Sequence, residues 1–317
     1  MTGLLVFKDK LKFFYGKYDR YITMLIKFLL GFLAFTMLNQ NIGFMTKLKN
    51  PLVPLLLGLV CSWLPYGAIT FLAAVFMLTH LYAISLEMTL IALAFMLIIG
   101  ILYYGFQPGD SFLLLVTPIL FWFKIPYMVP LLVGLSGGLT CVIPVSTGVF
   151  LYYAMQYVKQ NAGVLTNETS VDLVQKYAQI INSLLSNQLM LVMVAAFAIS
   201  ILVVFLIRNL SIDYAWMFAI IAGTVTQLGV IFIGDFVFNV SVPMVQLILG
   251  AVLSVLLAGV YDFMFFSVDY SRTEYTQFED DDYYYYVKAV PKLTVSAPDV
   301  KVQKISIKKS SKGTKTL

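Results

Sequence analysis

The feature that most constrains this chain is a long apolar middle that carries very few charges. The 317 residues include 37 charged ones, yet only fourteen of these fall between positions 21 and 266. Charged residues make up 12% of the chain, against roughly 25% in soluble domains, and the mean hydropathy is +0.88. A stretch this long and this poor in charge predicts an all-α fold, a polytopic bundle of transmembrane helices.

The apolar runs set the expected number of helices. A helix needs about 20 apolar residues to cross a hydrocarbon core of roughly 30 Å. The runs near this length are 21–38, 66–86, 88–106, 188–207, 214–233 and 243–266. Shorter runs lie at 51–64, 111–123, 127–143 and 145–158. We predict ten crossings if every run spans, and eight if 51–64 and one later short run re-enter on the same side.

The charges divide the chain into five parts and orient it. These are a basic N-terminus (1–20), a transmembrane region with a possible repeat (21–158), an extracytoplasmic amphipathic segment (159–187), a three-helix transmembrane region (188–266) and a largely flexible tail (267–317). The N-terminus has five basic residues against two acidic ones, and the tail has nine basic residues. The positive-inside rule therefore places both ends in the cytoplasm of a plasma-membrane protein, with Lys47 and Lys49 as exceptions that fall outside.

A weak internal repeat lies in the first transmembrane region. Residues 53–59 read VPLLLGL and residues 129–135 read VPLLVGL, and each copy is followed by a cysteine and then by a proline, Pro65 or Pro144. Small residues follow each proline. The pattern predicts short or broken helices around two Pro/Gly breaks.

Paired broken helices are the best sequence pointer to a transporter site, because their unpaired backbone groups persist only where protein, water or a solute meets them. We therefore predict a pathway for a small solute, still unknown, at the two breaks. Its candidate residues are Pro65, Tyr66, Gly67, Pro144, Ser146, Thr147 and Gly148. The alternative is a pair of tight turns between short tilted helices.

Ionisable residues within the membrane are functional candidates. His80, the only histidine, precedes Glu87 by seven residues, which would place both on one helical face as a proton relay. The alternative is an interfacial histidine that is hydrogen-bonded to a neighbouring helix. Arg208 and Asp213 are expected to pair across a short loop.

The sequence gives little support for a catalytic function. Residues 134–138 satisfy G-x-S-x-G and resemble the serine motif of rhomboid intramembrane proteases, but those place their histidine on a later helix, and His80 precedes Ser136. With one histidine and two cysteines in apolar segments, we expect no metal site and no cofactor. We therefore expect no enzyme, and the basic residues that flank apolar runs favour lipid headgroups over nucleic acid.

The polar segments suggest surface roles. Apolar positions three or four apart in 159–187 predict an amphipathic helix, with Asp172 and Lys176 as an i,i+4 pair. The tail contains FEDDDYYYYVKAVPK and has no compact core, so it is either disordered or adds a strand to a partner. This tail resembles that of an uncharacterised family of bacterial multi-pass membrane proteins, which implies a bacterial plasma membrane and brings no known activity.

These observations favour a small-solute transporter or permease embedded in the lipid bilayer. The rival is a non-transporting membrane scaffold that recruits a cytoplasmic protein through the tail. An intramembrane enzyme comes third.

Overall fold

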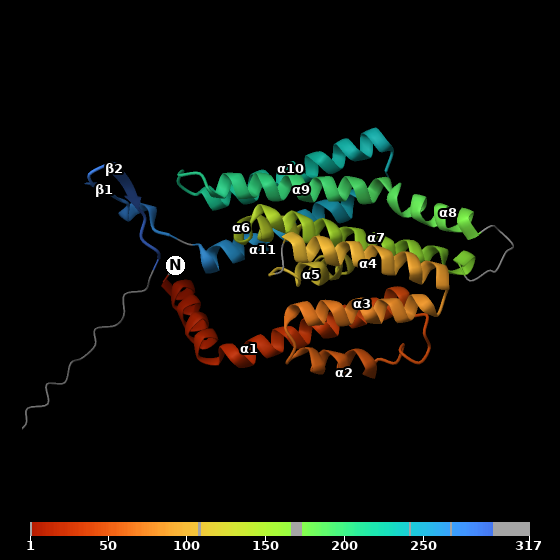
Figure 1. Cartoon of the computed structure of the whole chain (residues 1–317). Coiled ribbons are helices and arrows are strands. Elements are labelled where there is room, and N and C mark those ends of the chain that lie inside the picture. Colours follow the sequence, from red (N-terminus) through yellow and green to blue (C-terminus); the bar gives the residue numbers. More distant parts are fainter. Residues whose placement is uncertain (1, 107–108, 166–172, 241, 267, 294–317) are drawn as a thin grey trace, which may run out of the picture.

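The computed structural model describes residues 2–106, 109–165, 173–240, 242–266 and 268–293. These residues form an all-α bundle with one small β-hairpin after it (Figure 1). The α-helices are α1 (Thr2–Ile42), α2 (Leu52–Cys61), α3 (Tyr66–Tyr82), α4 (Leu86–Phe106), α5 (Leu113–Trp122), α6 (Met128–Ser136), α7 (Val142–Leu165), α8 (Leu173–Leu185), α9 (Gln188–Arg208), α10 (Ala215–Phe238) and α11 (Met244–Phe265). The hairpin strands are β1 (Glu274–Glu279) and β2 (Tyr284–Ala289), and two short 3₁₀ turns are η1 (Leu139–Cys141) and η2 (Tyr270–Arg272).

The predicted fold class is confirmed, with a distinction between long and short helices. Five helices are long and apolar enough to cross a membrane: α1, η1–α7 taken together, α9, α10 and α11. The ten residues of α2 or of α5 rise only about 15 Å, half of a hydrocarbon core. The bundle therefore combines full-length helices with short ones that turn back inside it.

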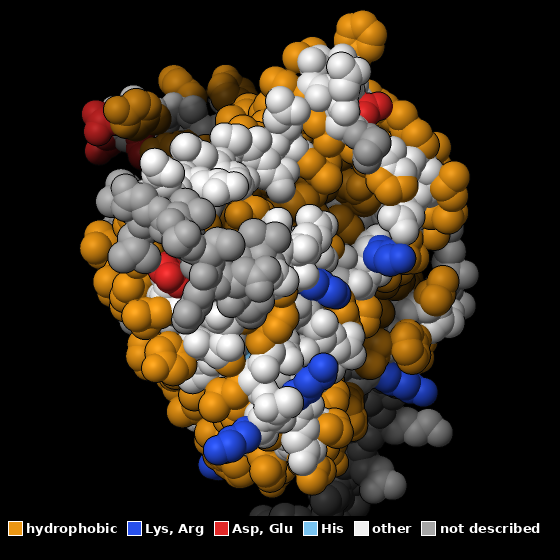
Figure 2. All heavy atoms as spheres, turned by 90° about the vertical axis from the view of Figure 1, so that its right-hand side faces the viewer, with side chains coloured by type: hydrophobic (Ala, Val, Ile, Leu, Met, Phe, Trp, Pro, Cys, Tyr) orange, Lys and Arg blue, Asp and Glu red, His pale blue; other side chains and the backbone are white. Residues whose placement is uncertain are grey.

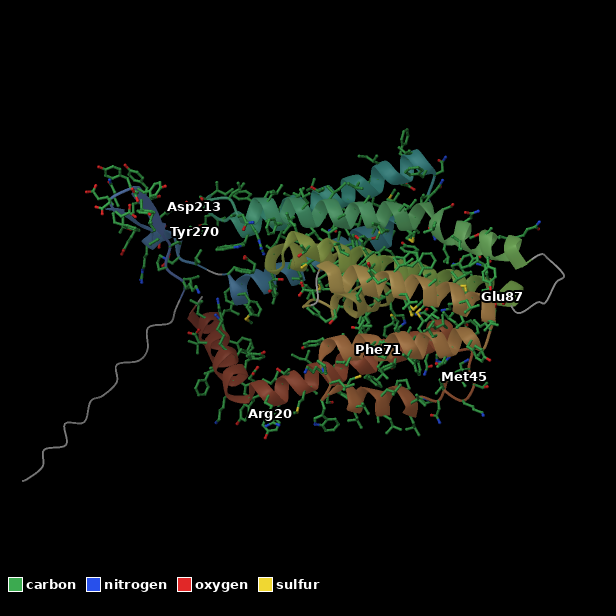
Figure 3. All side chains as sticks on the ribbon, viewed as in Figure 1. Arg20, Met45, Phe71, Glu87, Asp213 and Tyr270 are labelled. Atoms are coloured by element: carbon green, nitrogen blue, oxygen red, sulfur yellow. The ribbon has the colours of Figure 1, made fainter. Side chains whose placement is uncertain are left out.

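Helix α1 has two parts. Its helical backbone geometry is interrupted at Tyr18, which has φ −119° and ψ 22°. Figure 1 shows the helix bending there. Figure 3 places Arg20 at this bend. The charged first part therefore lies across the end of the bundle, while the apolar second part runs along it.

Both ends of the described chain lie at the same end of the bundle, which we call the terminal end (Figure 1). Helices α9, α10 and α11 follow one another in an antiparallel series, and the last of them leads to the hairpin at that end. The even parity of crossings expected from the charges agrees with this arrangement.

The two copies of the repeat have the same local architecture. In each, a short helix (α2 or α6) runs toward the terminal end, the chain breaks, and a longer helix (α3 or α7) runs back (Figure 1). The glycine of each motif lies against a long helix. A Cβ on Gly58 would meet the backbone of Phe32 in α1 at 3.2 Å, and one on Gly134 would meet Val204 in α9 at 2.6 Å. Both glycines therefore allow close helix contact.

The second break lies earlier than predicted. The sequence placed it at residues 144–148, but these residues belong to the first two turns of α7, where a proline is tolerated. The chain instead breaks at Gly137 and Gly138, between α6 and η1. Pro144 therefore does not interrupt a helix.

The core forms around long helices that belong to different parts of the chain. One buried cluster joins α1, α3 and α4 to α5, α7 and the inner face of α8. A second joins α7 and α9 to the turn before α6 and to α11. Helix α8 contributes Ile180 and Leu184, which confirms the predicted amphipathic helix; the Asp172–Lys176 pair lies outside the described residues.

The tail is more ordered than predicted in one part. Strands β1 and β2 pair antiparallel, with Thr276 opposite Val287. The expectation that the tail is largely flexible is therefore wrong for 274–289, because the tyrosine-rich strand finds its partner within the tail itself. Lys288 fixes the hairpin to the α9–α10 loop by donating to Asp213 at 2.6 Å. Figure 3 shows Asp213 beside Tyr270 at this junction.

Candidate functional site

The first predicted break is a tight turn. Pro65 is the exposed residue before α3, and Tyr66 is half-buried, with its ring 5.3 Å from Lys27 Nζ. Gly67 lines a cavity of about 170 Å³ between α1, α3, α4, α5 and α7, whose walls are apolar apart from Thr70 and Ser111. Of the seven predicted pathway residues, Gly67 is the one that lines this cavity.

The second set of predicted residues packs within the bundle. Thr147 Oγ1 donates to the Ile143 carbonyl of its own helix at 2.9 Å, and Ser146 is half-buried. Gly148 lies against α5, since a Cβ there would meet Thr117 at 2.6 Å. Pro144 is buried. The structure does not bring the two sets together around one polar cavity.

His80 and Glu87 lie on different helices, because α3 ends at Tyr82 and α4 begins at Leu86. The expectation of one shared helical face is therefore wrong. His80 is fully buried and its Nδ1 accepts from the Met45 amide at 3.2 Å, while Glu87 accepts from Ser85. Figure 3 shows Met45 and Glu87 at the same end of the bundle. Among the described residues neither ring nitrogen of His80 is hydrogen-bonded to Glu87.

Ser136 is held by its own helix. Its Oγ donates to the Leu132 carbonyl at 2.7 Å. Within the described part of the chain, the only hydrogen-bond partner of the His80 ring is the Met45 amide. The serine and the histidine therefore form no nucleophile–base pair in this structure.

Protein groups satisfy the backbone at both breaks of the repeat. After α2, the amides of Ser62, Trp63 and Leu64 each donate to a carbonyl three residues back. After α6, Arg208 at the end of α9 donates to the carbonyls of Leu135 and Gly137. Arg208 therefore donates to these two carbonyls in place of the expected pair with Asp213.

A third break, between α5 and α6, differs from the other two because it lies partway along the bundle and lines a large polar cavity. The chain turns at residues 123–127, and Lys124 has a left-handed φ of 63°. Two contacts show how far along the neighbouring helices this turn lies. The Tyr127 ring packs against Phe197, nine residues into α9, which corresponds to about 14 Å. Gly250, six residues into α11, faces the Lys124 carbonyl.

Above this turn lies a cavity of about 450 Å³, which we call the tyrosine–amide pocket. It opens between the turn, α7 and the first residues of α9 and α11, at the end of the bundle away from the termini. Its lining residues are Phe121, Lys124, Pro126, Tyr127, Tyr152, Tyr153, Gln156, Tyr157, Gln160, Asn187, Leu189, Met193, Val242, Pro243 and Gln246. Small-molecule sites usually measure roughly 300–1,000 Å³.

The pocket combines an aromatic floor with neutral polar walls. Phe121 stacks on Tyr152 with ring centroids 4.7 Å apart, and the Tyr153 ring meets both at wider angles. Gln156 Nε2 donates to the Tyr152 hydroxyl at 3.1 Å, which orients that amide. Within the part of the chain that the structure describes, Lys124 is the one charged lining residue, and no carboxylate lines the pocket. These groups suit hydroxyl or carbonyl groups and the apolar face of a ring.

The neighbouring helices hold the turn in place. A Cβ on Gly250 would lie 2.9 Å from the Tyr127 ring and 3.3 Å from the Lys124 carbonyl, so only glycine lets α11 approach the turn this closely. Gln227 of α10 is fully buried and its Nε2 lies 3.5 Å from the Tyr127 carbonyl. Its Oε1 has no partner among the described residues.

Figure 2 looks onto the end of the bundle that contains the pocket opening. Several basic side chains are scattered over the visible part of this face, together with some acidic ones and many apolar ones.

Sequence reasoning missed the pocket. Neither Lys124 nor the tyrosines and glutamines of α7 were among the candidate residues. The available signal was the Lys124-Ile125-Pro126 sequence inside an apolar stretch, because a lysine and a proline together disfavour a continuous buried helix.

The long apolar helices define a multi-pass membrane protein, and its polar cavity is built from helix ends and the turn at 123–127. No family model, no curated protein and no solved structure matches the chain. The resemblance of the tail to a bacterial family therefore stays a prediction.

Proposed function

We propose that the protein is a permease or transporter of a small polar solute, which binds in the tyrosine–amide pocket. The observation that carries the proposal is the turn at 123–127, in which Phe123 and Lys124 are exposed while Pro126 and Tyr127 are buried. Irregular backbone at membrane depth is tolerated where protein buries it or where it lines a water-filled cavity, and transporters place such backbone at their solute sites. Here the turn lines a cavity of suitable size and polarity.

The lining narrows the class of solute. Four tyrosines and four amide side chains offer hydrogen bonds to hydroxyl and carbonyl groups. Because no carboxylate among the described residues lines the pocket, a cation finds no counter-charge there, whereas Lys124 favours a neutral or singly anionic solute. The proposed solutes are therefore sugars, polyols or monocarboxylates.

Orientation follows from the charges as a further part of the proposal. The terminal end carries the basic N-terminus and the basic tail, so we place it in the cytoplasm of a bacterial plasma membrane. The tyrosine–amide pocket then opens to the outside, as expected of an uptake protein.

Uptake into proteoliposomes tests the proposal. The full chain is reconstituted and offered labelled glucose, glycerol, lactate and, as a cationic comparison, lysine. We expect uptake of a neutral or monoanionic probe above protein-free vesicles, and a loss of at least roughly tenfold in Gln156→Leu, which removes a hydrogen-bonding amide from the wall.

The matched control is Gln175→Leu, at an exposed position of α8, which should leave uptake unchanged. Equal uptake by the Gln156→Leu protein and its control would contradict the proposed site. Uptake of lysine alone would contradict the proposed solute class.

A second candidate, the scaffold, rests on the hairpin. Tyr275, Tyr284 and Tyr286 are 67–79% exposed, and a two-stranded hairpin leaves both edges open to strand addition. Replacing 274–289 with a Gly/Ser linker separates the two candidates. Transport predicts that uptake survives, whereas scaffolding predicts that function is lost with the hairpin.

A further inference from the structure

A second polar cavity, of about 660 Å³, lies where α1 ends, α2 begins and α7 passes. We call it the α1–α2 pocket. Its lining residues are Phe32, Thr36, Asn39, Gln40, Asn41, Gly43, Phe44, Lys49, Pro51, Pro54 and Lys159. None of them lines the tyrosine–amide pocket, so the two sites are independent.

Two lysines give the α1–α2 pocket a positive charge. Lys159 Nζ donates to Asn41 Oδ1 at 3.2 Å, which leaves its other N–H groups available. No acidic residue lines the pocket, and neither Lys49 nor Lys159 has an ion pair within the described residues. The pocket therefore offers charge-assisted hydrogen bonds to an anion such as a phosphate.

Two buried oxygens in the same pocket have no hydrogen-bond partner among the described residues. Asn39 is only 8% exposed, and its Nδ2 donates to the Leu48 carbonyl at 3.0 Å. That bond fixes the amide, so Oδ1 is the free atom. Thr36 Oγ1, one helical turn earlier, is also buried and free. A buried acceptor without a partner costs about 1–3 kcal/mol, so a ligand that carries a hydroxyl would be favoured here.

The surroundings of the pocket reach the lipid. Leu52 and Leu56 on α2 are about 60% exposed, and in a membrane bundle such apolar side chains face acyl chains. Phe32, Pro51 and Pro54 form the apolar wall that continues into this surface. A ligand with a polar head and an apolar tail could lie across both.

We propose that the α1–α2 pocket binds a phosphate ester that carries free hydroxyls, in which Lys49 and Lys159 hold the phosphate and Asn39 and Thr36 accept from the hydroxyls. The same chemistry occurs in a lipid headgroup, as in phosphatidylglycerol, and in a free polyol phosphate, as in glycerol 3-phosphate.

Native mass spectrometry of the full chain in detergent tests this proposal. The probes are phosphatidylglycerol, phosphatidic acid, phosphatidylcholine and glycerol 3-phosphate. We expect retention of phosphatidylglycerol to exceed that of phosphatidylcholine by roughly tenfold or more, and the double variant Lys49→Gln, Lys159→Gln to abolish the difference. Lys47→Gln is the matched control, because Lys47 is exposed and lies outside the lining.

Thr36→Val and Asn39→Leu test the contacts to the ligand hydroxyls. Thr36→Val keeps the shape of the side chain, so it still tests them if the Asn39→Leu protein does not fold. Both should reduce the preference for phosphatidylglycerol over phosphatidic acid, which lacks the headgroup hydroxyls. If glycerol 3-phosphate competes with phosphatidylglycerol, the natural ligand is a free solute. If it does not compete, the natural ligand is a lipid. Equal retention of phosphatidylglycerol and phosphatidylcholine by the unmodified protein would overturn the proposal.

Discussion

Lys8 Nζ donates a 2.7 Å hydrogen bond to the carbonyl oxygen of Phe263, a residue 255 positions later in the chain. The lysine is only 3% exposed, and its ammonium also lies 5.2 Å from the centre of the Phe263 ring. This contact joins the first part of α1 to the end of α11. It explains why α1 bends at Tyr18 across the terminal end of the bundle instead of continuing straight.

Removing that contact should destabilise the bundle. Lys8→Met keeps the length of the side chain but leaves the Phe263 carbonyl without its charged donor, which should lower the free energy of unfolding by about 1–2 kcal/mol. Thermal unfolding in detergent measures the change. Lys10→Met is the control at an exposed position of the same helix, and equal stability of the two variants would contradict a structural role for the contact.

Arg208 should be essential for the break after α6. Arg208→Leu leaves the carbonyls of Leu135 and Gly137 without donors, at a cost of about 2 kcal/mol or more. Arg208→Lys should recover only part of this loss, because a single ammonium lacks the planar fork of a guanidinium. Denaturation midpoints compare both with Arg272→Gln, whose side chain is 82% exposed. A fully stable Arg208→Leu protein would show that the cap contributes nothing.

The motif glycines should not tolerate side chains. Gly134→Ala places a Cβ 2.6 Å from Val204, so α6 and α9 must separate, with an expected loss of about 1–3 kcal/mol. Gly229→Ala in α10 has open space around it and should be neutral or slightly stabilising. Equal unfolding temperatures for the two variants would show that the close contact between α6 and α9 does not require glycine at position 134.

Acid should open the turn of the tail hairpin. The Tyr285 hydroxyl, and then the amides of Asp282 and Tyr283, donate to Asp280 and lower the pKa of its carboxyl below 3.8. A lowered pKa stabilises the folded turn above pH 3.8, and this contribution is lost as the pH falls through the lower folded value.

Spin labels at the facing positions 276 and 287 report this opening as a longer distance between labels in the full-length protein. We expect a constant distance from pH 7 to about pH 4 and an increase at lower pH. Asp280→Asn should remove the pH dependence. An unchanged distance at pH 2 in the unmodified tail would contradict the role given to Asp280.

The long helices could be predicted from the sequence because apolar length alone determines them. The runs at 188–207, 214–233 and 243–266 differ from α9, α10 and α11 by a few residues at most, apart from the end of α10 at Phe238. Burial of backbone polar groups in lipid leaves such segments no alternative to a helix. The amphipathic period likewise predicted α8.

The site could not be predicted in the same way, since contacts between distant segments determine it. Arg208 meets α6 through a contact across more than 70 positions, and Lys288 replaces it as the partner of Asp213. The pocket arises because the turn at 123–127 lies among α7, α9 and α11. The spacing of the repeat in the sequence pointed instead to its prolines, which the structure does not bring together around one polar cavity.

If the tyrosine–amide pocket is a solute site, water and solute must reach the turn between α5 and α6. Single cysteines at positions 124, 156, 67 and 147, in a Cys61→Ser, Cys141→Ser background, test it with a membrane-impermeant thiol reagent. We predict rapid labelling at 124 and 156, which line the tyrosine–amide pocket, and protection at 67, which lines an apolar cavity, and at 147, which is half-buried in α7. Labelling at 67 and 147 with protection at 124 and 156 would contradict the account and return the solute pathway to the two breaks of the repeat.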